Sequence, residues 1–563
     1  MESWSDEVME KSANTNTPSP QHSTTPPSSM VRSTGALGAA TMASRVLGLV
    51  REMVYASFMG QGGVASAFFI AFTIPNLLRR LLGEGALSAA FVPVFTDRLQ
   101  RDGRAAAWRA ANSVASVLAV GLVGVTVLAV IVLGMLLTVS PETIQHLLVR
   151  FAELFHAKRP ASDGAATIPL ILRLSQVMFP YTIFACLGAM AMGMLNALRH
   201  FFVPAFSPVL LNIALIGSVF LICPFFGSAP EQQVFGLAVG VLIGGVFQLA
   251  YQLPQLWREG WRPCWHFDCR DETVRQVAKL LAPSVIGVVA YQINVVVGRL
   301  LGLAVGDYVP AALNYADRLM ELPQGVFGVS LATYMLPTLS AIATRGAMED
   351  FRVEIGRALR FLMTISVPAT VGLIVLGEPI VRLLFERGRF DAESTRHCAF
   401  ALQFSVIGLT FYSSTSILAR AFYAMKNTKT PMYVALASMV ANIAFSLCLM
   451  WPLKEGGLAL SNSLSAVLNA TLLFILLRRR IGSLHGGALA SAAARIALAA
   501  LIMAAACWGA HHWLAARLAA TTLAHNLALV LVPIAVGAAV YFAAAFVLAG
   551  EEMRAILRSH RRG

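Results

Sequence analysis

Long apolar stretches recur along this chain from Ser33 to Leu548, and they restrict its fold more than any other feature of the sequence. A bilayer hydrocarbon core of about 30 Å requires roughly 20 apolar residues per helix. Only helices and closed barrels satisfy their backbone hydrogen bonds at that depth. Of the 563 residues, 57% are hydrophobic and 13% are charged, whereas about a quarter of the residues in soluble domains are charged. The sequence therefore predicts an all-α polytopic membrane protein.

We predict about fourteen transmembrane helices, with boundaries good to a few residues. The predicted spans are 33–58, 64–97, 110–139, 168–197, 203–225, 232–256, 276–302, 309–343, 357–380, 393–424, 430–452, 456–477, 488–514 and 523–549. Residues 1–32 are rich in Ser, Thr and Pro, which predicts a disordered tail. They contain no secretory signal pattern, so we expect membrane insertion to begin at the first span.

Basic residues mark one set of alternate loops. Lys and Arg are frequent near residues 98–109, 258–275, 345–360 and 478–480, and they are sparser in the opposite loops. By the positive-inside rule this asymmetry places both termini in the cytoplasm, and the basic tail at 551–563 agrees. The net charge of +14 therefore reports topology, and we predict no binding of nucleic acid.

The spacing of cysteine and histidine indicates neither a disulfide framework nor a metal site. The seven cysteines are scattered, and most lie in apolar spans. Cys264, His266 and Cys269 share one loop, but their spacing matches no zinc template and a second ligand pair is missing. We predict no metal and no cofactor.

An internal repeat relates two distant parts of the chain. ALRHFFVP at 197–204 aligns with AMKNTKTP at 424–431, with a small residue, an apolar residue, a cation and a proline at equal spacing. Asn-Ile-Ala follows each segment, at Asn212 and Asn442.

A second echo pairs residues 74–93 with residues 322–337 in the same direction along the chain. Six predicted spans separate the partners, so each pair keeps one orientation in the membrane. The simplest interpretation is two parallel six-helix lobes, 33–256 and 257–480, with a cavity between them. Residues 481–550 then add two further helices.

Several charged residues lie within predicted spans, where each unpaired charge costs roughly 2.5–3.5 kcal/mol on insertion scales. They are Arg45, Arg51, Glu52, Arg79, Arg80 and Glu84 in the first two spans, and Asp317, Arg318 and Glu321 in the eighth. Such residues usually face a wet cavity on the path of a transported molecule. Guanidinium groups bind phosphate oxygens bidentately and stay charged at low dielectric, so the cluster suggests a phosphate-bearing cargo.

Other interpretations of these charges stay open at this point. Glu52 and Arg80 are equally consistent with internal ion pairs or with side chains that snorkel to the interface. Arg299, near the end of the seventh span, is as well explained as an interfacial anchor. The substrate-binding interpretation is favoured for the four remaining arginines, Arg45, Arg51, Arg79 and Arg318.

Proline and glycine interrupt the second and eighth spans, where they remove backbone hydrogen bonds or loosen the helix. The predicted hinge residues are Pro75, Gly83 and Gly85 in the second span, and Pro323 and Gly325 in the eighth. The competing interpretation is that membrane helices tolerate such residues for packing alone.

Five segments of the chain are similar to motifs of one transporter family. They are SRVLGLVRE, AFTIPNLLRRLLGEGALSAAFVPVF, NYADRLMELPQGVFGVSL, NALRHFFVPAFSPVLLNI and LLFERGRF. On these segments the chain resembles the MurJ (MviN) family of lipid II flippases, within the multidrug/oligosaccharidyl-lipid/polysaccharide exporter superfamily. The resemblance covers about residues 33–550.

The resemblance implies a transporter, not an enzyme, that flips lipid II from the cytoplasmic to the outer leaflet of the bacterial inner membrane by alternating access. Its cargo would be undecaprenyl diphosphate carrying a disaccharide-pentapeptide. The polyprenyl tail would stay in membrane lipid, in a groove beside the last two helices. Other cell-wall synthesis proteins are candidate partners.

The resemblance also implies roles for single residues. The family's substrate-binding positions map onto Arg45, Arg51, Arg79, Arg318 and the acidic partner Glu84. Supporting or gating roles are expected for Glu52, Asn76, Arg80, Asp317 and Glu321.

The chain departs from the family pattern at three places. Many members have an acidic residue before AFF and a lysine before the IPN motif, where this chain has Ser66 and Thr73. Some members bind sodium through a carboxylate in the seventh span, but SVIGVVAYQINVVVGR contains none. We therefore expect no sodium coupling and a drive by membrane potential.

Two other classes of function compete with this interpretation, and an ion channel is poorly supported. An exporter of drugs or of another polyprenyl-linked glycan shares the fold, and a fold does not fix its substrate. The arginine cluster argues against cationic drugs. A membrane enzyme acting on lipid diphosphates needs grouped loop carboxylates, metal ligands or a nucleophile and its base, and we find no such motif in the sequence.

Overall fold

The computed structural model describes residues 27–80, 87–138, 163–325, 329–484, 486–518 and 522–548, and all regular structure in these residues is helical. The first elements are α1 (Pro27–Met59), α2 (Gly63–Leu78), α3 (Leu87–Arg101), α4 (Gly103–Leu137), α6 (Asp163–Met178), α7 (Tyr181–Ala197), α8 (Phe202–Leu221), η2 (Cys223–Phe226), α9 (Pro230–Ala250) and α10 (Leu253–Arg258). The later elements are α11 (Glu272–Val305), α12 (Val309–Pro323), α13 (Val329–Thr344), α14 (Met348–Phe385), α15 (Ala392–Ser405), η4 (Val406–Gly408), α16 (Leu409–Ala424), α17 (Lys429–Ile481), α18 (Gly486–Ala515) and α19 (Leu523–Leu548).

Long apolar helices dominate the part of the chain that the structure describes. Eight of them are long and apolar enough to cross a membrane, and a ninth span results if the bent pair Thr167–Met178 and Tyr181–Ala197 counts as one. The prediction of an all-α polytopic membrane protein is confirmed, whereas the number fourteen stays a prediction. The helices that carry the charged cluster do not meet this criterion. α1 is too polar, and α2 and α12 are too short.

The predicted spans 430–452 and 456–477 form one kinked element, α17. The kink lies at Lys454, whose φ of 48° is outside the helical region. Pro452 precedes it within the helix, and proline removes a backbone hydrogen bond there. The two halves of α17 therefore keep the separate directions that two spans need.

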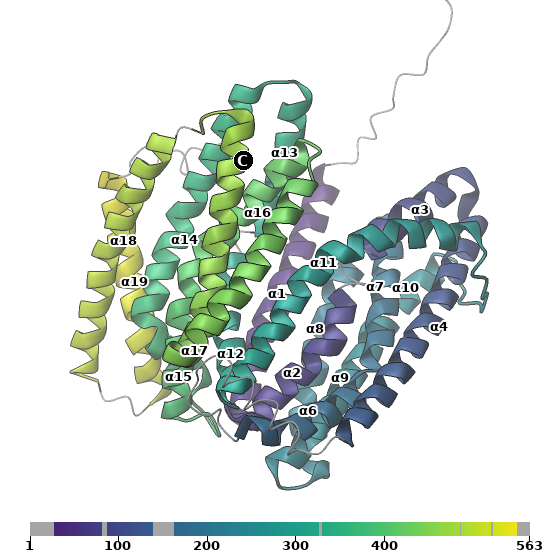
Figure 1. Ribbon diagram of the computed structural model, residues 1–563, viewed down its shortest axis with the longest axis horizontal. Coiled ribbons are helices and arrows are strands. Elements are labelled where there is room, and N and C mark those ends of the chain that lie inside the picture. Colours follow the sequence, from purple (N-terminus) through teal and green to yellow (C-terminus); the bar gives the residue numbers. More distant parts are fainter. Residues whose placement is uncertain are drawn as a thin grey trace, which may run out of the picture.

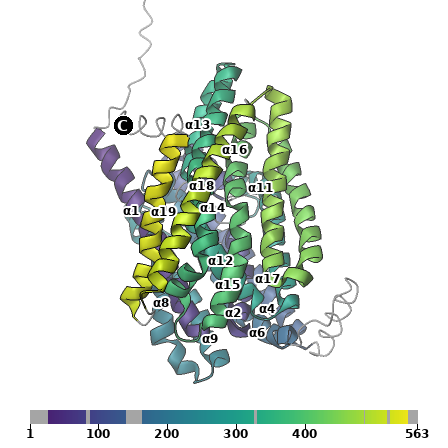
Figure 2. The same ribbon diagram turned by 90° about the vertical axis from the view of Figure 1, so that its left-hand side faces the viewer.

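Figure 1 shows two groups of helices that diverge toward one end of the molecule. One group contains α3, α4 and α6 to α10, the other contains α13 to α19, and α1, α2, α11 and α12 lie between them. The last two helices, α18 and α19, pack on α14 at the outer side of the second group (Figure 2). α11 contacts α3 of the first group and α17 of the second, so its contacts do not assign it to one group. The lobe boundary at residues 256 and 257 stays a prediction.

The repeated motifs end their helices in the same way. Arg199, after α7, and Lys426, after α16, are two of the three non-glycine residues with positive φ in the described chain, at 65° and 57°. The next residue in each case donates its backbone N–H to a carbonyl five residues earlier, His200 to Leu195 at 2.8 Å and Asn427 to Phe422 at 2.9 Å. Both are Schellman caps, which satisfy carbonyls at the helix end. The sequence echo therefore corresponds to one shared backbone conformation.

Candidate functional site

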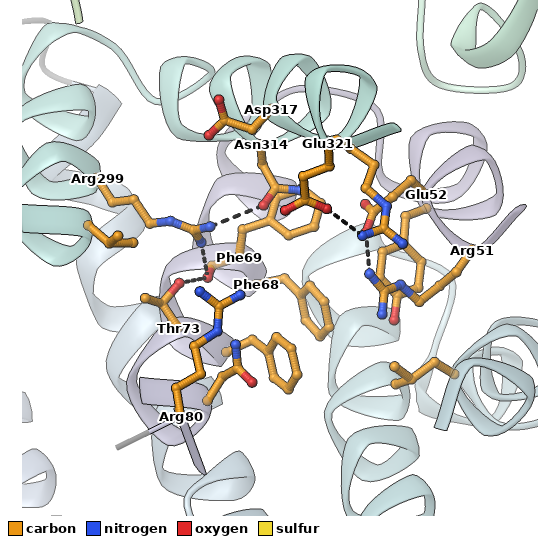
Figure 3. A pocket seen from close by; sticks show the side chains of 16 residues that line it. Arg51, Glu52, Phe68, Phe69, Thr73, Arg80, Arg299, Asn314, Asp317 and Glu321 are labelled. Carbon is orange, nitrogen blue, oxygen red and sulfur yellow. Dashed lines mark hydrogen bonds and ion pairs between the residues drawn. The ribbon is translucent and has the colours of Figure 1, made fainter. Parts of the chain in front are cut away.

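A cavity of about 220 Å³ lies between the four central helices and α8 (Figure 3). Side chains from α1, α2, α8, α11 and α12, together with Arg80 just after α2, form its wall. The lining residues are Arg51, Glu52, Tyr55, Phe68, Phe69, Phe72, Thr73, Asn76, Arg80, Leu215, Val295, Arg299, Asn314, Asp317, Arg318 and Glu321. Four arginines, three carboxylates and four aromatic side chains thus contribute to one cavity wall.

The cavity lies well inside the helix bundle. Arg51 precedes the end of α1 at Met59 by roughly two helical turns, about 12 Å. Arg318 lies a similar distance beyond the start of α12 at Val309. Because the hydrocarbon core is about 30 Å thick, these charges lie near the middle of the membrane when that end of the bundle is at its surface.

Arg51 is held on several sides within the cavity wall. Its Nη1 donates to Asn212 Oδ1 at 3.1 Å, its Nη2 forms an ion pair with Glu52, and its guanidinium lies 5.6 Å from the centre of the Tyr55 ring. Within the described residues, the buried Nε of Arg51 and Oε2 of Glu52 have no hydrogen-bond partner. Arg51 is therefore fixed in place with part of its donor capacity unused. Asn212, which we identified only as part of the repeat, positions it.

Arg318 lies on the facing helix, α12, and its charge is also paired. Its Nη1 forms an ion pair with Glu321 at 2.8 Å, and both side chains are partly exposed, at 24% and 51%. Its guanidinium covers Gly48 of α1, where a Cβ would overlap Nη2. Glycine at this position lets the arginine of one helix lie directly on the backbone of the other.

Arg45 makes the reciprocal contact and does not line the cavity. Its guanidinium covers Gly325, just beyond α12, where a Cβ would overlap Nη1. Gly325, a predicted hinge, therefore serves here as a contact surface between α1 and the end of α12. Residues 324 and 325 have a π-helical conformation, which is frequent at functional sites.

Arg299 lines the cavity, although the sequence alone explained it equally well as an interfacial anchor. Its Nη1 donates to the Phe69 carbonyl at 2.6 Å and its Nη2 to Asn314 Oδ1 at 3.1 Å (Figure 3). The Thr73 hydroxyl donates to the same carbonyl at 2.6 Å. Arg299 thereby joins α11 to α2 and α12. Arg299 has apolar residues on both sides in the sequence, as Arg45 and Arg51 do. The same criterion could therefore have identified it as a cavity residue.

The two arginines at the end of α2 differ in position. Arg80 extends into the cavity (Figure 3), whereas Arg79 is absent from its wall and donates from Nε to Asn76 Oδ1 at 2.8 Å. Pro75 lies within α2 and Pro323 is the last residue of α12. The predicted site residue Glu84 and the predicted hinges Gly83 and Gly85 lie outside the described residues.

Direct contacts between the two halves of the chain close the cavity at the turn between α1 and α2. The Tyr315 hydroxyl donates to the Gly60 carbonyl at 3.1 Å, and the Ala311 N–H donates to Ser66 Oγ at 3.1 Å. Arg389 donates its backbone N–H to Ser57 O at 3.0 Å and its guanidinium to Phe58 O at 2.9 Å. We call this set of residues the closed end: Ser57, Phe58, Gly60, Ser66, Ala311, Tyr315 and Arg389.

The closed end explains two features of the sequence. Ser66, where many family members have an acidic residue, accepts an N–H from the first turn of α12 that has no partner within that helix. Gly60 and Gly388 have positive φ, at 67° and 60°. A Cβ at Gly60 would lie 2.6 Å from Arg389 O, and a Cβ at Gly388 would overlap Ser57 O. The LLFERGRF segment thus fits against the end of α1 only with glycine at these positions.

Comparison with known families gives one consistent result. The family model described as lipid II flippase MurJ matches residues 55–529. The chain is 33% identical over 535 residues to the probable lipid II flippase MurJ of Rhizobium tropici, covering 95% of this chain and 97% of the relative. It is 34% identical over 536 residues to the corresponding protein of Rhizobium meliloti (strain 1021), with the same coverage. A lipid II flippase MurJ of Burkholderia cenocepacia is 33% identical over 444 residues, covering 78% of this chain and 82% of the relative.

Solved structures agree on the fold. The structure titled "Lipid II flippase MurJ, inward closed conformation" superposes with a TM-score of 0.71 at 24% identity, covering 92% of this chain and 99% of that one. An inward-facing multidrug resistance transporter of the MATE family, in the MOP superfamily, gives a TM-score of 0.57 at 14% identity, covering 80% and 98%. At these identities the likeness concerns the fold alone.

Proposed function

This chain belongs to the MurJ family of lipid II flippases, and we propose that it flips lipid II by holding the lipid's diphosphate in the cavity between α1, α2, α11 and α12. It is a multi-pass transporter of the bacterial inner membrane and not an enzyme. Its substrate is a membrane lipid, and its activity serves peptidoglycan synthesis.

The observation that carries the proposal is the pair of arginines that α1 and α12 contribute to the cavity wall. Arg51 projects from α1 and Arg318 from α12, at a depth where charge is costly. Each phosphate of a lipid diphosphate carries a negative charge, and guanidinium groups bind such oxygens in a bidentate geometry. A diphosphate between the two helices would satisfy both arginines at once.

The acidic partners act as internal competitors for the substrate in this proposal. Glu321 is half exposed, and exposed ion pairs contribute only about 0–1 kcal/mol, so a diphosphate displaces it from Arg318 at little cost. Glu52 is buried against Arg51, and removing one partner of such a pair leaves an uncompensated charge. Arg51 therefore stays paired and forms the fixed wall of the site, while Arg318 exchanges its partner.

The size of the cavity limits what it holds. About 220 Å³ is below the range of roughly 300–1,000 Å³ found for pockets that enclose drug-sized ligands. The cavity accommodates the diphosphate in this state, and we place the disaccharide and pentapeptide of the cargo beyond it, away from the closed end. The undecaprenyl tail stays in lipid.

The alternating-access cycle follows from the closed end. We propose that both termini are cytoplasmic, as the loop charges suggest, so the closed end faces the periplasm. Release to the outer leaflet then requires the lobes 33–256 and 257–480 to rock apart there. Membrane potential is the proposed drive, and other cell-wall synthesis proteins are proposed partners on either side of the membrane.

Depletion of the protein tests the proposed function directly. In cells without a second lipid II flippase, we expect lipid II accessible from outside the inner membrane to fall, while its cytoplasmic synthesis continues. Accessible lipid II is measured by an impermeant probe and compared with total lipid II from the same cells. Normal exposure after depletion would contradict the proposal.

The two arginines after α2 provide a matched comparison. We expect Arg80→Ala to lower lipid II exposure more than Arg79→Ala, because the Arg80 side chain lines the cavity, whereas Arg79 is not part of its wall and donates to the lining residue Asn76. Both changes remove one positive charge from neighbouring positions, so general electrostatic effects are matched. Equal losses in the two variants, at equal protein levels, would argue against the cavity as the diphosphate site.

A further inference from the structure

The segment between α10 and α11 is bound along the start of α4. Trp261 Nε1 donates to Asn112 Oδ1 at 2.9 Å, and Asn112 Nδ2 donates to the Arg262 carbonyl at 2.9 Å. One turn further along α4, Ser116 Oγ accepts the backbone N–H of His266 at 3.0 Å. Figure 1 places α10, α4 and the start of α11 together at the outer edge of the molecule.

The far end of the segment is fixed as well. Asp271 begins α11 and accepts hydrogen bonds from the N–H groups of Thr273 and Val274 and from the Ser113 hydroxyl. Partial burial alone would raise the pKa of Asp271, but these hydrogen bonds lower it below its usual value. The carboxylate is therefore ionised at neutral pH and holds the segment to α4.

Large aromatic side chains point outward from this segment. Trp265 is 68% exposed and Phe267 is 49% exposed, and Trp257 at the end of α10 is also exposed. Isolated exposed apolar residues are ordinary. Two exposed aromatic residues on one short, fixed segment, with a third at the adjoining end of α10, instead indicate an interaction surface.

The position of the segment along α4 places these aromatics at the membrane interface. α4 is lipid-facing, with outward apolar side chains such as Val123 and Leu128, and Arg109 is the last charged residue before its long apolar run. Ser116 lies roughly 10 Å further along the helix. Trp265, next to the residue bonded to Ser116, is thus at the depth where Trp residues concentrate in membrane proteins.

Positive charge surrounds the aromatics. Arg109, Arg258 and Arg270 are exposed, and no ion pair involves them in the described chain. Among the nearby acids, Glu259 pairs with Arg104 at 3.3 Å and contacts His200 at 2.8 Å. Asp268 accepts the Arg270 backbone N–H at 2.7 Å and keeps its negative charge, but the three arginines outnumber it. The surface is therefore both aromatic and basic.

We propose that residues 261–270 form an interfacial lipid-binding segment, which binds anionic phospholipids. Trp265 and Phe267 insert at the boundary between headgroups and acyl chains, and Arg109, Arg258 and Arg270 bind lipid phosphates. Juxtamembrane basic residues are attracted to anionic membrane surfaces, and aromatics anchor the apolar side. The segment that connects the proposed lobes is thereby held at the bilayer surface, next to α4.

Tryptophan fluorescence in nanodiscs tests the insertion. The contribution of Trp265 is obtained by subtracting the emission of Trp265→Phe from that of the unchanged protein, in discs of phosphatidylcholine and phosphatidylglycerol. We expect lipids brominated near the top of the acyl chain to quench this contribution strongly and aqueous iodide to quench it weakly. Trp108→Phe is the control, because Trp108 is buried on α4, the helix along which the segment lies, and its contribution is expected to respond to neither quencher.

A second arm tests the lipid class. With bromine on phosphatidylglycerol only, quenching of Trp265 is expected to exceed that seen with bromine on phosphatidylcholine only, and Arg258→Gln with Arg270→Gln is expected to remove the difference. Arg345→Gln, an exposed arginine on the other half of the molecule, is expected to preserve it. Quenching by iodide alone would show a water-facing surface for a soluble partner and would overturn the proposal. Equal quenching by both brominated lipids in the unchanged protein would overturn the anionic-lipid assignment.

Discussion

Replacement of Arg318 by alanine is expected to lower lipid II flipping by roughly ten- to hundredfold, because hydrogen bonds to charged groups contribute about 1.5–3 kcal/mol. Arg318 is the cavity arginine that exchanges its acidic partner for the diphosphate in our proposal. Its side chain is partly exposed, and its ion-pair partner among the described residues is the half-exposed Glu321, so its removal leaves no buried acid unpaired. The variant is expected to fold and insert normally, and exposed lipid II at matched protein level measures its flipping.

Two further variants separate charge from geometry at this position. Arg318→Lys keeps the charge but loses the bidentate fork, so we expect it to restore only part of the activity. Glu321→Gln removes the competing carboxylate and is expected to retain flipping. If Arg318→Ala flips lipid II at the unchanged rate, the diphosphate does not bind at this cavity.

The charged cluster could be predicted from the sequence because a charge inside an apolar span has few structural explanations. This reasoning identified Arg51 and Arg318, which both line the cavity. It could not identify their local partners, since Asn212 reaches Arg51 from α8, far along the chain. For the same reason the sequence could not decide the role of Arg299, which depends on contacts with Phe69 and Asn314 on two other helices.

Neighbouring residues were harder to separate than distant ones. Successive residues in a helix point about 100° apart, so Arg79 and Arg80 cannot both face the same space. Residues 79 and 80 have a π-helical conformation. No periodicity in the sequence indicates where a helix takes that form, so the sequence could not choose between the two arginines.

The fold class was predictable because the apolar stretches and their lengths can be recognised directly in the sequence. The exact points at which the spans begin and end were harder to predict. The break between the predicted spans 430–452 and 456–477 lies within α17 at Lys454, which adopts a positive φ that its residue type does not suggest. The repeat could be recognised in the sequence, but the backbone conformation that its two copies share could not. Arg199 and Lys426 both adopt a left-handed conformation at a helix end, where glycine is the usual residue.

Replacement of Gly388 by alanine is expected to open the closed end and to stop flipping. Gly388 has a φ of 60°, and a Cβ there would overlap the backbone oxygen of Ser57. Backbone cannot move aside as a flexible side chain does, so the loop must leave the end of α1 and both hydrogen bonds from Arg389 to that end are lost. A thiol introduced by Gln61→Cys, at a buried position beside these contacts, reports the opening through labelling by an impermeant maleimide. The exposed Cys264, Cys269 and Cys448 are first replaced by serine.

Gly346→Ala provides the matched control for this change. Gly346 has a similar φ of 71°, but a Cβ there would meet nothing within 4 Å. Both substitutions therefore carry the left-handed strain of about 1–2 kcal/mol, and only Gly388→Ala adds the clash with α1. We expect rapid labelling of the introduced thiol and loss of lipid II exposure with Gly388→Ala, and neither with Gly346→Ala. Slow labelling in both variants would mean that the LLFERGRF segment does not hold the closed end together, and the lobes would have to separate by breaking other contacts.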